Sequence, residues 1–168
     1  MLLITRPRRF GKTLFMDTLA RFLRFEEGRR NTRAQAPEEL FAGLNILKDR
    51  AFCDAFMGRF PVIFISLKGV YGKDFKEARK KLAAKVFDAC ASFACLQESL
   101  RLTAWDKQDL RHCMDKGFLS DPENETLLQS SLQLLAKCLF KHHGRPVVLL
   151  IDEYDVPLAK VAAGGYYE

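Results

Sequence analysis

Short runs of consecutive apolar residues alternate along the chain with segments in which apolar residues recur at helical spacing. The continuous runs are Met1–Thr5, Val62–Leu67 and Val147–Ile151. An unbroken apolar run of about four to eight residues is typical of a strand that is buried on both faces. We therefore expect each of these runs to form a strand, with helices between them.

Helical spacing of apolar residues also predicts where the helices lie. The predicted helices are Lys12–Phe25, Glu38–Leu47, Asp74–Phe93, Thr103–Lys116 and one that opens at Asp121-Pro122. Asp74 with Glu77 resembles a capping box, and Gly117 is expected to end the fourth helix as its C′ glycine. Glu27–Pro37 is predicted to be a polar loop, and Phe52–Phe60 shows no clear period.

Strands that alternate with helices imply parallel pairing and an α/β fold. No internal repeat or second domain is visible, so residues 1–168 are expected to form a single, partial domain. After Val147–Ile151 the chain offers no further strand, whereas a sheet has about five strands on average. We therefore expect a sheet that is incomplete after the last apolar run.

Composition narrows the class of protein. Hydrophobic residues make up 48% of the chain, which argues against disorder. The apolar runs are too short to span a bilayer, and the N-terminus lacks the basic region and cleavage site of a signal peptide, so a cytoplasmic protein is expected. The five cysteines have no CxxC spacing, and most of them are expected to be small core residues.

The formal net charge of +6 favours partners that carry phosphate, including nucleic acid. Much of the excess lies in short basic runs, which are Arg6–Arg9, Arg29-Arg30 and Arg79–Lys81. Such runs are also compatible with ordinary solvated faces, so the charge alone does not decide between these interpretations.

A phosphate-binding loop is predicted directly after the first apolar run. Arg6–Thr13 aligns with the Walker A pattern G-x-x-x-x-G-K-[ST], except that Arg6 replaces the first glycine. Gly11 lets the backbone approach a phosphate, Lys12 places a positive charge on the β and γ phosphates, and Thr13 supplies a hydroxyl ligand for Mg²⁺. The nucleotide-binding set is predicted to be Arg8, Arg9, Phe10, Gly11, Lys12, Thr13 and Leu14.

A Walker B motif is predicted at the end of the last apolar run. Asp152 follows Val147–Ile151 and is expected to help hold Mg²⁺, while Glu153 is expected to orient and activate the attacking water. A polar turn after a strand would explain this acidic pair equally well if it stood alone. Together the two motifs predict a Mg²⁺-dependent ATP site at the carboxyl ends of the strands, with Lys12 and Glu153 in catalytic roles.

Several other residues are candidates for a metal site or a nuclease motif. Cys138 with His142 and His143 has helical spacing but no second ligand pair, so a helix end is the better interpretation. Asp74-Phe75-Lys76 matches a D-x-K nuclease fragment, yet its position favours a helix cap. Trp105 is expected to pack half-buried.

Three segments together resemble the bacterial AAA-ATPase-like family. They are Leu3–Leu14, Phe60–Ile63 and Leu150–Leu158. In that family R-P-R-R-F-G-K-[ST] is the usual phosphate loop, so Arg6 is ordinary there. The resemblance implies a three-layer P-loop fold with a parallel sheet, and roles for Lys12, Thr13, Asp152 and Glu153. Members are longer, and many carry a C-terminal region similar to PD-(D/E)XK nucleases.

We therefore expect an ATP-binding domain that uses ATP and Mg²⁺, with hydrolysis by attack of water on the γ-phosphate. The rival hypotheses are a non-hydrolysing nucleotide-binding or interaction fragment of a larger protein and a nucleic-acid-binding protein. No membrane partner is expected, and a homo-oligomer is left open.

Overall fold

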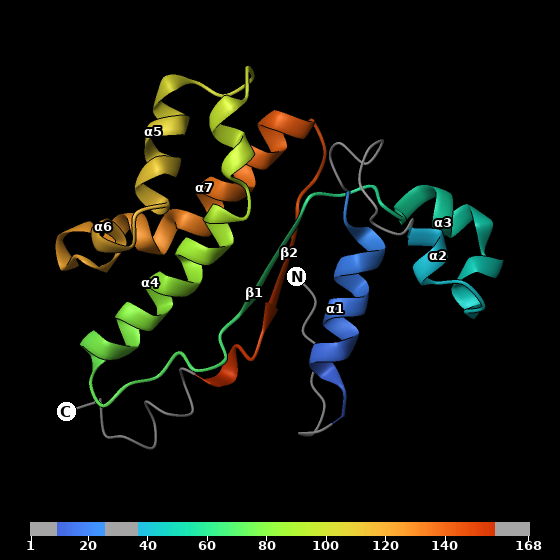
Figure 1. Cartoon of the computed structure of the whole chain (residues 1–168), viewed down its shortest axis with the longest axis horizontal. Coiled ribbons are helices and arrows are strands. Elements are labelled where there is room, and N and C mark those ends of the chain that lie inside the picture. Colours follow the sequence, from blue (N-terminus) through green and yellow to red (C-terminus); the bar gives the residue numbers. More distant parts are fainter. Residues whose placement is uncertain (1–9, 26–36, 157–168) are drawn as a thin grey trace. The chain divides into compact units, whose positions relative to one another are not determined.

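The structure is a computed structural model that describes residues 10–25 and 37–156 (Figure 1). The predicted strand Met1–Thr5 and most of the predicted loop Glu27–Pro37 lie outside the described residues. The chain divides into two compact units, Met1–Val62 and Ile63–Glu168. The expectation of one domain over residues 1–168 stays a prediction.

The first unit is helical in its described part. It contains α1 (Lys12–Leu23), α2 (Pro37–Leu40), the 3-10 helix η2 (Asn45–Lys48) and α3 (Arg50–Phe56). The predicted helix Glu38–Leu47 is therefore two short pieces, and α3 occupies the stretch that showed no period. Its buried cluster consists of Phe22, Phe41 and Cys53.

Directly after α1 the chain pairs with the segment around Phe60, which precedes β1. The Arg24 amide closes the last turn by donating to the Ala20 carbonyl at 2.9 Å. Arg24 then forms a parallel bridge with Phe60, and the Phe25 amide donates to the Phe60 carbonyl at 2.7 Å. This extended pairing explains why the helix ends at Leu23, slightly before the predicted Phe25.

The second unit is a two-stranded parallel sheet covered by helices. Its elements are β1 (Val62–Ser66), α4 (Phe75–Ala91), η3 (Ala94–Glu98), α5 (Ala104–Cys113), α6 (Lys116–Ser120), η4 (Pro122–Asn124), α7 (Glu125–His143) and β2 (Val148–Asp152). Parallel neighbours require a long crossover connection, and the helices between β1 and β2 supply it. The expectation of a mixed α/β fold with parallel strands is confirmed.

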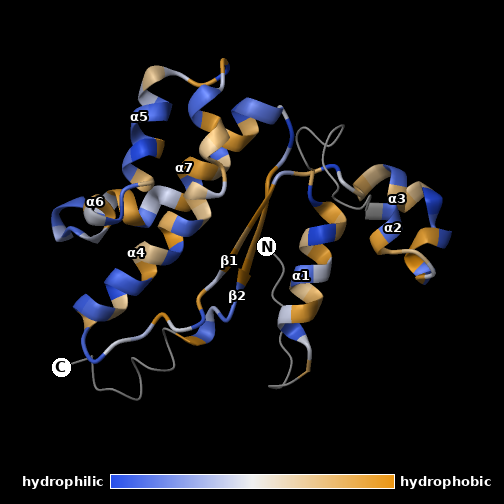
Figure 2. Cartoon of the chain, viewed as in Figure 1, coloured by the Kyte–Doolittle hydropathy of each residue, from blue (hydrophilic) through white to orange (hydrophobic). Residues whose placement is uncertain are grey.

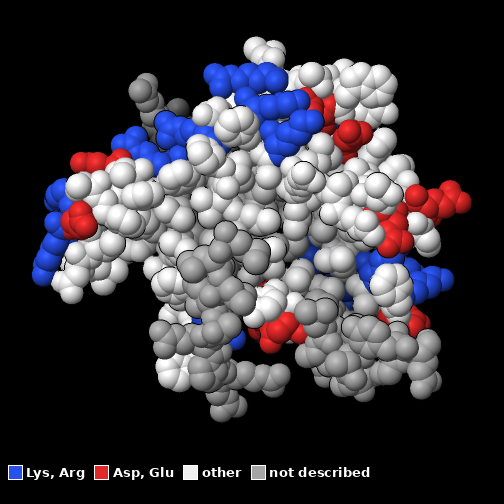
Figure 3. Space-filling view, turned by 180° about the vertical axis from the view of Figure 1, so that it is seen from behind, with Lys and Arg blue, Asp and Glu red and all other residues white. Residues whose placement is uncertain are grey.

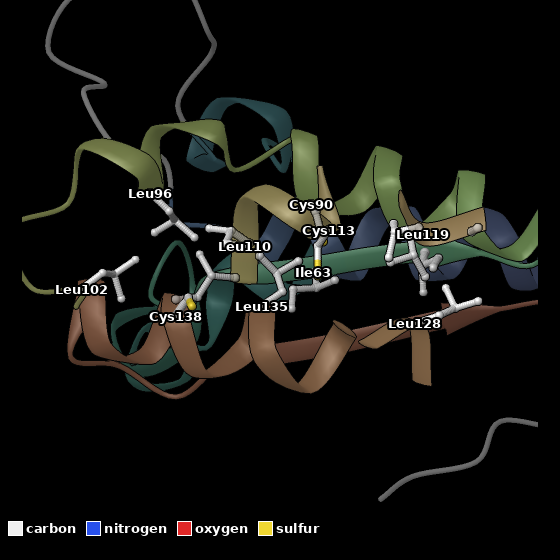
Figure 4. Close-up of a cluster of buried hydrophobic side chains, with 14 residues drawn as sticks. Ile63, Cys90, Leu96, Leu102, Leu110, Cys113, Leu119, Leu128, Leu135 and Cys138 are labelled. Carbon is white, nitrogen blue, oxygen red and sulfur yellow. The ribbon is translucent and has the colours of Figure 1, made fainter. Parts of the chain in front are cut away.

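The main core lies between these helices and one face of β1. Fourteen buried residues form it, among them Ile63 and Ile65 of β1 together with Leu135 and Leu139 of α7 (Figure 4). In Figure 2 the strands are hydrophobic along their length, whereas α4 and α5 carry polar residues between their apolar ones. Cys90, Cys113 and Cys138 belong to this core and Cys53 is buried in the first unit, so four cysteines pack as predicted while Cys95 is exposed.

Two sequence predictions about helix ends are tested directly. Asp74 caps α4, because its carboxylate accepts a hydrogen bond from the Glu77 amide at 2.7 Å, and this confirms the interpretation as a cap. Gly117 does not end a helix. The preceding α5 ends at Cys113, and the Asp115 carboxylate starts α6 by accepting from the Phe118 amide at 3.0 Å, which places Gly117 inside α6.

Arg79 is buried, so it does not lie on a solvated face, which was one of the two interpretations left open for the basic runs. Its guanidinium donates to the Ser120 carbonyl at 2.6 Å and to the Asp121 carbonyl. The prediction for Trp105 is wrong. Trp105 is 76% exposed rather than half-buried, because its neighbour Asp106 takes the inward position of that helical turn.

Strand β2 also departs from the expectation of burial on both faces. Leu150 and Asp152 are buried, whereas Leu149 is 41% and Ile151 38% exposed. Among the described residues β2 has β1 as its hydrogen-bonded neighbour and lies at an edge of the sheet. The side chains of β2 therefore alternate between a buried face, with Leu150 and Asp152, and a partly exposed face, with Leu149 and Ile151.

Candidate nucleotide site

The predicted phosphate loop is described from Phe10 onward. Gly11 precedes α1 with φ 72° and ψ 21°, the left-handed conformation that glycine adopts without strain. Its carbonyl accepts from the Phe15 amide at 2.9 Å and so opens the helix. A side chain at this position would meet open space, so the conformation of the turn, rather than crowding, requires glycine.

Lys12 and Thr13 are the first two residues of α1, so their backbone amides belong to the helix N-terminus. The first amides of a helix have no partner within the helix and point outward, which makes this end suited to phosphate. No side chain caps α1 and its first turn contains no acidic residue. The start of α1 therefore has the local geometry and the charge that an anion requires.

The other predicted residues around the loop are placed as follows. Phe10 and Leu14 are exposed on either side of Gly11-Lys12-Thr13. Arg8 and Arg9 lie outside the described residues, as do Arg6 and Pro7.

The predicted Walker B residues lie at the end of β2. Asp152 is the last residue of the strand and is buried, and its carbonyl accepts from the Leu67 amide, just beyond β1, at 2.9 Å. Glu153 follows outside the strand and is partly exposed, and its carbonyl accepts from the Val156 amide at 3.1 Å. Asp152 is thus the more buried and Glu153 the more exposed carboxylate of the pair.

The backbone of Glu153 shows a feature that the sequence did not predict. Its φ is 53°, and within the described ranges it alone among non-glycine residues has a positive φ. This conformation is costly for a residue with a side chain, and such strain concentrates at functional sites. The unusual backbone therefore marks the same position that the motif singled out.

These side chains provide the donor set that a magnesium nucleotide requires. Asp152 offers a buried carboxylate, Thr13 a hydroxyl and Lys12 an ammonium group, and α1 offers its first backbone amides. Hard oxygen ligands suit Mg²⁺, which is held through few protein groups and the phosphates of the nucleotide. The chemistry of the residues present thus fits the expected cofactors.

The structure describes this site in two halves. It brings Lys12 and Thr13 together on one turn of α1 in the first unit, and Asp152 and Glu153 together at the end of β2 in the second. That the two halves form one joint site is a prediction from the two motifs.

The sequence patterns did not predict that the loop between β1 and α4 begins next to the Walker B residues. The Leu67 hydrogen bond to Asp152 places the start of this loop beside the end of β2, and Figure 1 shows the two strand ends side by side. The expected parallel pairing of the two apolar runs implies this neighbourhood, because parallel strands end at the same edge of a sheet. The start of this loop, at Leu67, therefore lies beside the Walker B residues.

Metal binding outside the two motifs has no support among residues 10–25 and 37–156, where no group of three or more His, Cys, Asp or Glu side chains is arranged to hold an ion. Within the same ranges, the helices lack the length and apolar character that crossing a membrane requires.

Comparison with known proteins extends these observations. A protein from Azotobacter chroococcum mcd 1, called "Uncharacterized protein in vnfD 5'region", is 28% identical over 157 residues. The match covers 92% of this chain and 22% of that protein, so the chain spans about a fifth of the length of this curated relative. No solved structure matches the chain.

The family whose sequence model matches is described as "Predicted AAA-ATPase", and the match extends over residues 1–168. This agrees with the resemblance carried by the two motifs and implies a P-loop fold. The chain belongs to the AAA-ATPase-like family.

Proposed function

We propose that the chain binds ATP with Mg²⁺ and hydrolyses it, with Lys12 and Thr13 at the phosphates and Asp152 and Glu153 at the metal and the attacking water. The observation that carries the proposal is the left-handed Gly11, which leads directly into α1 with Lys12 and Thr13 in its first turn. Family membership supports the same nucleotide.

Lys12 and the amides of α1 would bind and orient the phosphates. The ammonium group offsets the charge of the β and γ phosphates, and the N-terminal end of the helix dipole acts in the same direction. Phe10 and Leu14 are exposed next to these groups and would contact the nucleotide from the loop side. Arg8 and Arg9 are proposed as further phosphate contacts on sequence grounds alone.

Asp152 and Glu153 would divide two roles between them. Asp152 is buried at the strand end and would help hold Mg²⁺, which when bound neutralises phosphate charge. Glu153 is more exposed and would accept a proton from the attacking water as a general base.

The first experiment measures ATP binding and phosphate release for the wild type, Lys12→Ala and Glu153→Gln. Lys12→Ala should lose both binding and turnover, because the phosphates lose their positive partner. Glu153→Gln should bind Mg²⁺ and ATP as the wild type does, but its turnover should fall by about 10²–10⁴, the usual contribution of a general base.

Lys48→Ala provides the matched control, because Lys48 is exposed in the first unit and lies outside both motifs. Turnover that is equal in the wild type and Lys12→Ala would refute the proposal.

A second candidate is a nucleotide-binding module that does not hydrolyse ATP. It is favoured by the partly uncovered face of β2, where Leu149 and Ile151 are exposed, and by the share of the relative that the chain spans. This candidate predicts a nucleotide-dependent rise in the melting temperature of the wild type without any phosphate release.

A further inference from the structure

A basic and aromatic surface surrounds the start of α4 in the second unit. Its residues, here called the α4 entry surface, are Lys68, Tyr71, Lys73, Phe75, Lys76 and Lys80. Residues 68–85 contain seven Lys or Arg side chains, of which Arg79 is buried, and two Asp or Glu, so this segment is positive for its length. Tyr71 is 44% and Phe75 66% exposed, although both are large aromatic side chains.

The backbone of this surface is held in place by specific contacts. The Lys81 ammonium donates to the Tyr71 carbonyl at 2.8 Å and lies 5.1 Å from the centroid of the Tyr71 ring. A side chain at Gly72 would come within 2.5 Å of Glu77 Cβ, so the turn packs closely on α4. The exposed aromatic rings are therefore presented by an ordered turn and the first turn of a helix.

The acidic side chains nearby are already engaged. Asp74 accepts from the Glu77 amide at 2.7 Å. Glu77 accepts from the Lys73 amide at 3.0 Å and pairs with Lys81 at 2.9 Å. Within the described ranges no ion pair includes Lys68, Lys73, Lys76 or Lys80, so their charges remain available to a partner from outside.

Another basic region lies around the C-terminal end of α7, and its charges are used internally. Lys141 pairs with the buried Asp106 at 2.6 Å, and Arg101 donates to the His142 carbonyl at 2.8 Å. Basic side chains gather near the top of the face drawn in Figure 3. Unlike Lys141, the four lysines of the α4 entry surface have no ion pair within the described ranges, so this surface is the better candidate for binding an anion from outside.

We propose that the α4 entry surface binds single-stranded nucleic acid. Exposed aromatic rings stack on bases of any sequence, and lysines next to them bind the phosphates. An ordinary solvated helix face would explain the lysines, and the feature that favours nucleic acid is that Tyr71 and Phe75 are exposed among them. The surface begins beside the end of β2, next to Asp152.

The test measures fluorescence anisotropy of a labelled oligothymidylate of about 20 nucleotides, with the full chain and without ATP. In Lys73→Glu/Lys76→Glu the Kd should rise about tenfold or more, and the slope of log K against log salt should shrink by about 1.4, or 0.7 for each lost phosphate contact. Phe75→Ala should weaken binding about tenfold, whereas Tyr71→Phe should keep it, because stacking needs the ring and not the hydroxyl.

The matched control is Lys48→Glu/Lys137→Glu, which changes the net charge equally at two exposed lysines elsewhere. Circular dichroism checks that each variant is folded. Equal losses in both charge-reversed pairs, or no binding by the wild type, would overturn the proposal. Polyglutamate that binds as tightly as the oligonucleotide would also overturn it, because the surface would then recognise acidic protein.

This inference does not depend on ATP hydrolysis. Lys12→Ala should bind the oligonucleotide with the affinity of the wild type, so failure of the ATP proposal and failure of this one give different results.

Discussion

Glu153 shows what a single residue reveals at this site. The motif assigns it the general-base role, and the structure gives it a left-handed backbone directly after a buried strand. A regular continuation of β2 would place its side chain on the face of the sheet opposite to that of Asp152. The left-handed turn instead redirects the chain immediately after Asp152, at the cost of local strain.

This strain can be measured by substitution. Glu153→Gly should leave the free energy of unfolding unchanged or raise it by up to about 1 kcal/mol, because glycine adopts positive φ without strain. Glu153→Val should lower it by about 1–2 kcal/mol, because a β-branched residue tolerates this conformation poorly. Urea unfolding of both variants gives the comparison.

Equal stability of the two variants would show that the positive φ of Glu153 carries no cost. The test concerns the backbone alone, and the role of the carboxylate in turnover is tested separately by Glu153→Gln.

Two helices of the second unit, α5 and α7, are joined by a partly buried ion pair. The start of α5 is fixed by a capping box between Thr103 and Asp106, and the same Asp106 carboxylate receives the Lys141 ammonium of α7 at 2.6 and 2.8 Å. The hydrogen bond from Lys141 is the largest cause that lowers the pKa of Asp106 from 3.8 to about 2. One carboxylate thus caps a helix and holds a second helix against it.

This arrangement predicts a definite dependence of stability on pH. Because the pKa of Asp106 is lower in the folded than in the unfolded chain, its contribution is present in full above about pH 4 and disappears as the pH falls through about 2. The contribution is about 2 kcal/mol. Asp106→Asn should therefore lower the free energy of unfolding at pH 7 by about that amount, and it should lose less stability than the wild type between pH 4 and pH 2.

Asp109→Asn is the control, because Asp109 is exposed on the same helix. Urea unfolding at several pH values distinguishes the variants. If Asp106→Asn and the wild type lost stability in parallel below pH 4, the ion pair would not be the cause.

On the scale of the whole molecule, the two units have cores of very different size. Within the described ranges the first unit buries a cluster of three residues, whereas the main core of the second unit has fourteen. In the first unit aromatic rings add packing, such as Phe22 and Phe41 with centroids 5.3 Å apart. Burial of apolar area dominates stability, so the two units should open with different free energies.

Hydrogen–deuterium exchange of the full chain measures this difference. Amides of α4 and α7 should be the most strongly protected, because both helices face the large core. Amides of α2 and α3 should exchange first, because these helices are short and bury few residues. Equal protection in the two units would contradict this account.

The sequence by itself determined the order of elements and the identity of the candidate residues. Continuous apolar runs identified β1 and β2, and helical spacing identified α4 and α7, because burial imposes a period on the side chains. The two motifs carried the family assignment, because their residue types and spacing are specific. Gly144 ends α7 in the left-handed conformation, with φ 66°, as is typical of glycine at the end of a helix.

What the sequence left open depends on contacts between residues that are distant in the chain. Only the tertiary structure decided that Arg79 is buried, since its partners Ser120 and Asp121 lie about 40 residues further on. Only the tertiary structure decided that Leu149 and Ile151 of β2 are partly exposed, because an apolar run has the same sequence pattern whether one or both of its faces are covered. The pairing of Leu67 with Asp152 likewise brought the start of the β1–α4 loop beside the Walker B residues. Local patterns encode which face of an element is apolar, whereas the neighbour that covers the face is chosen by the fold.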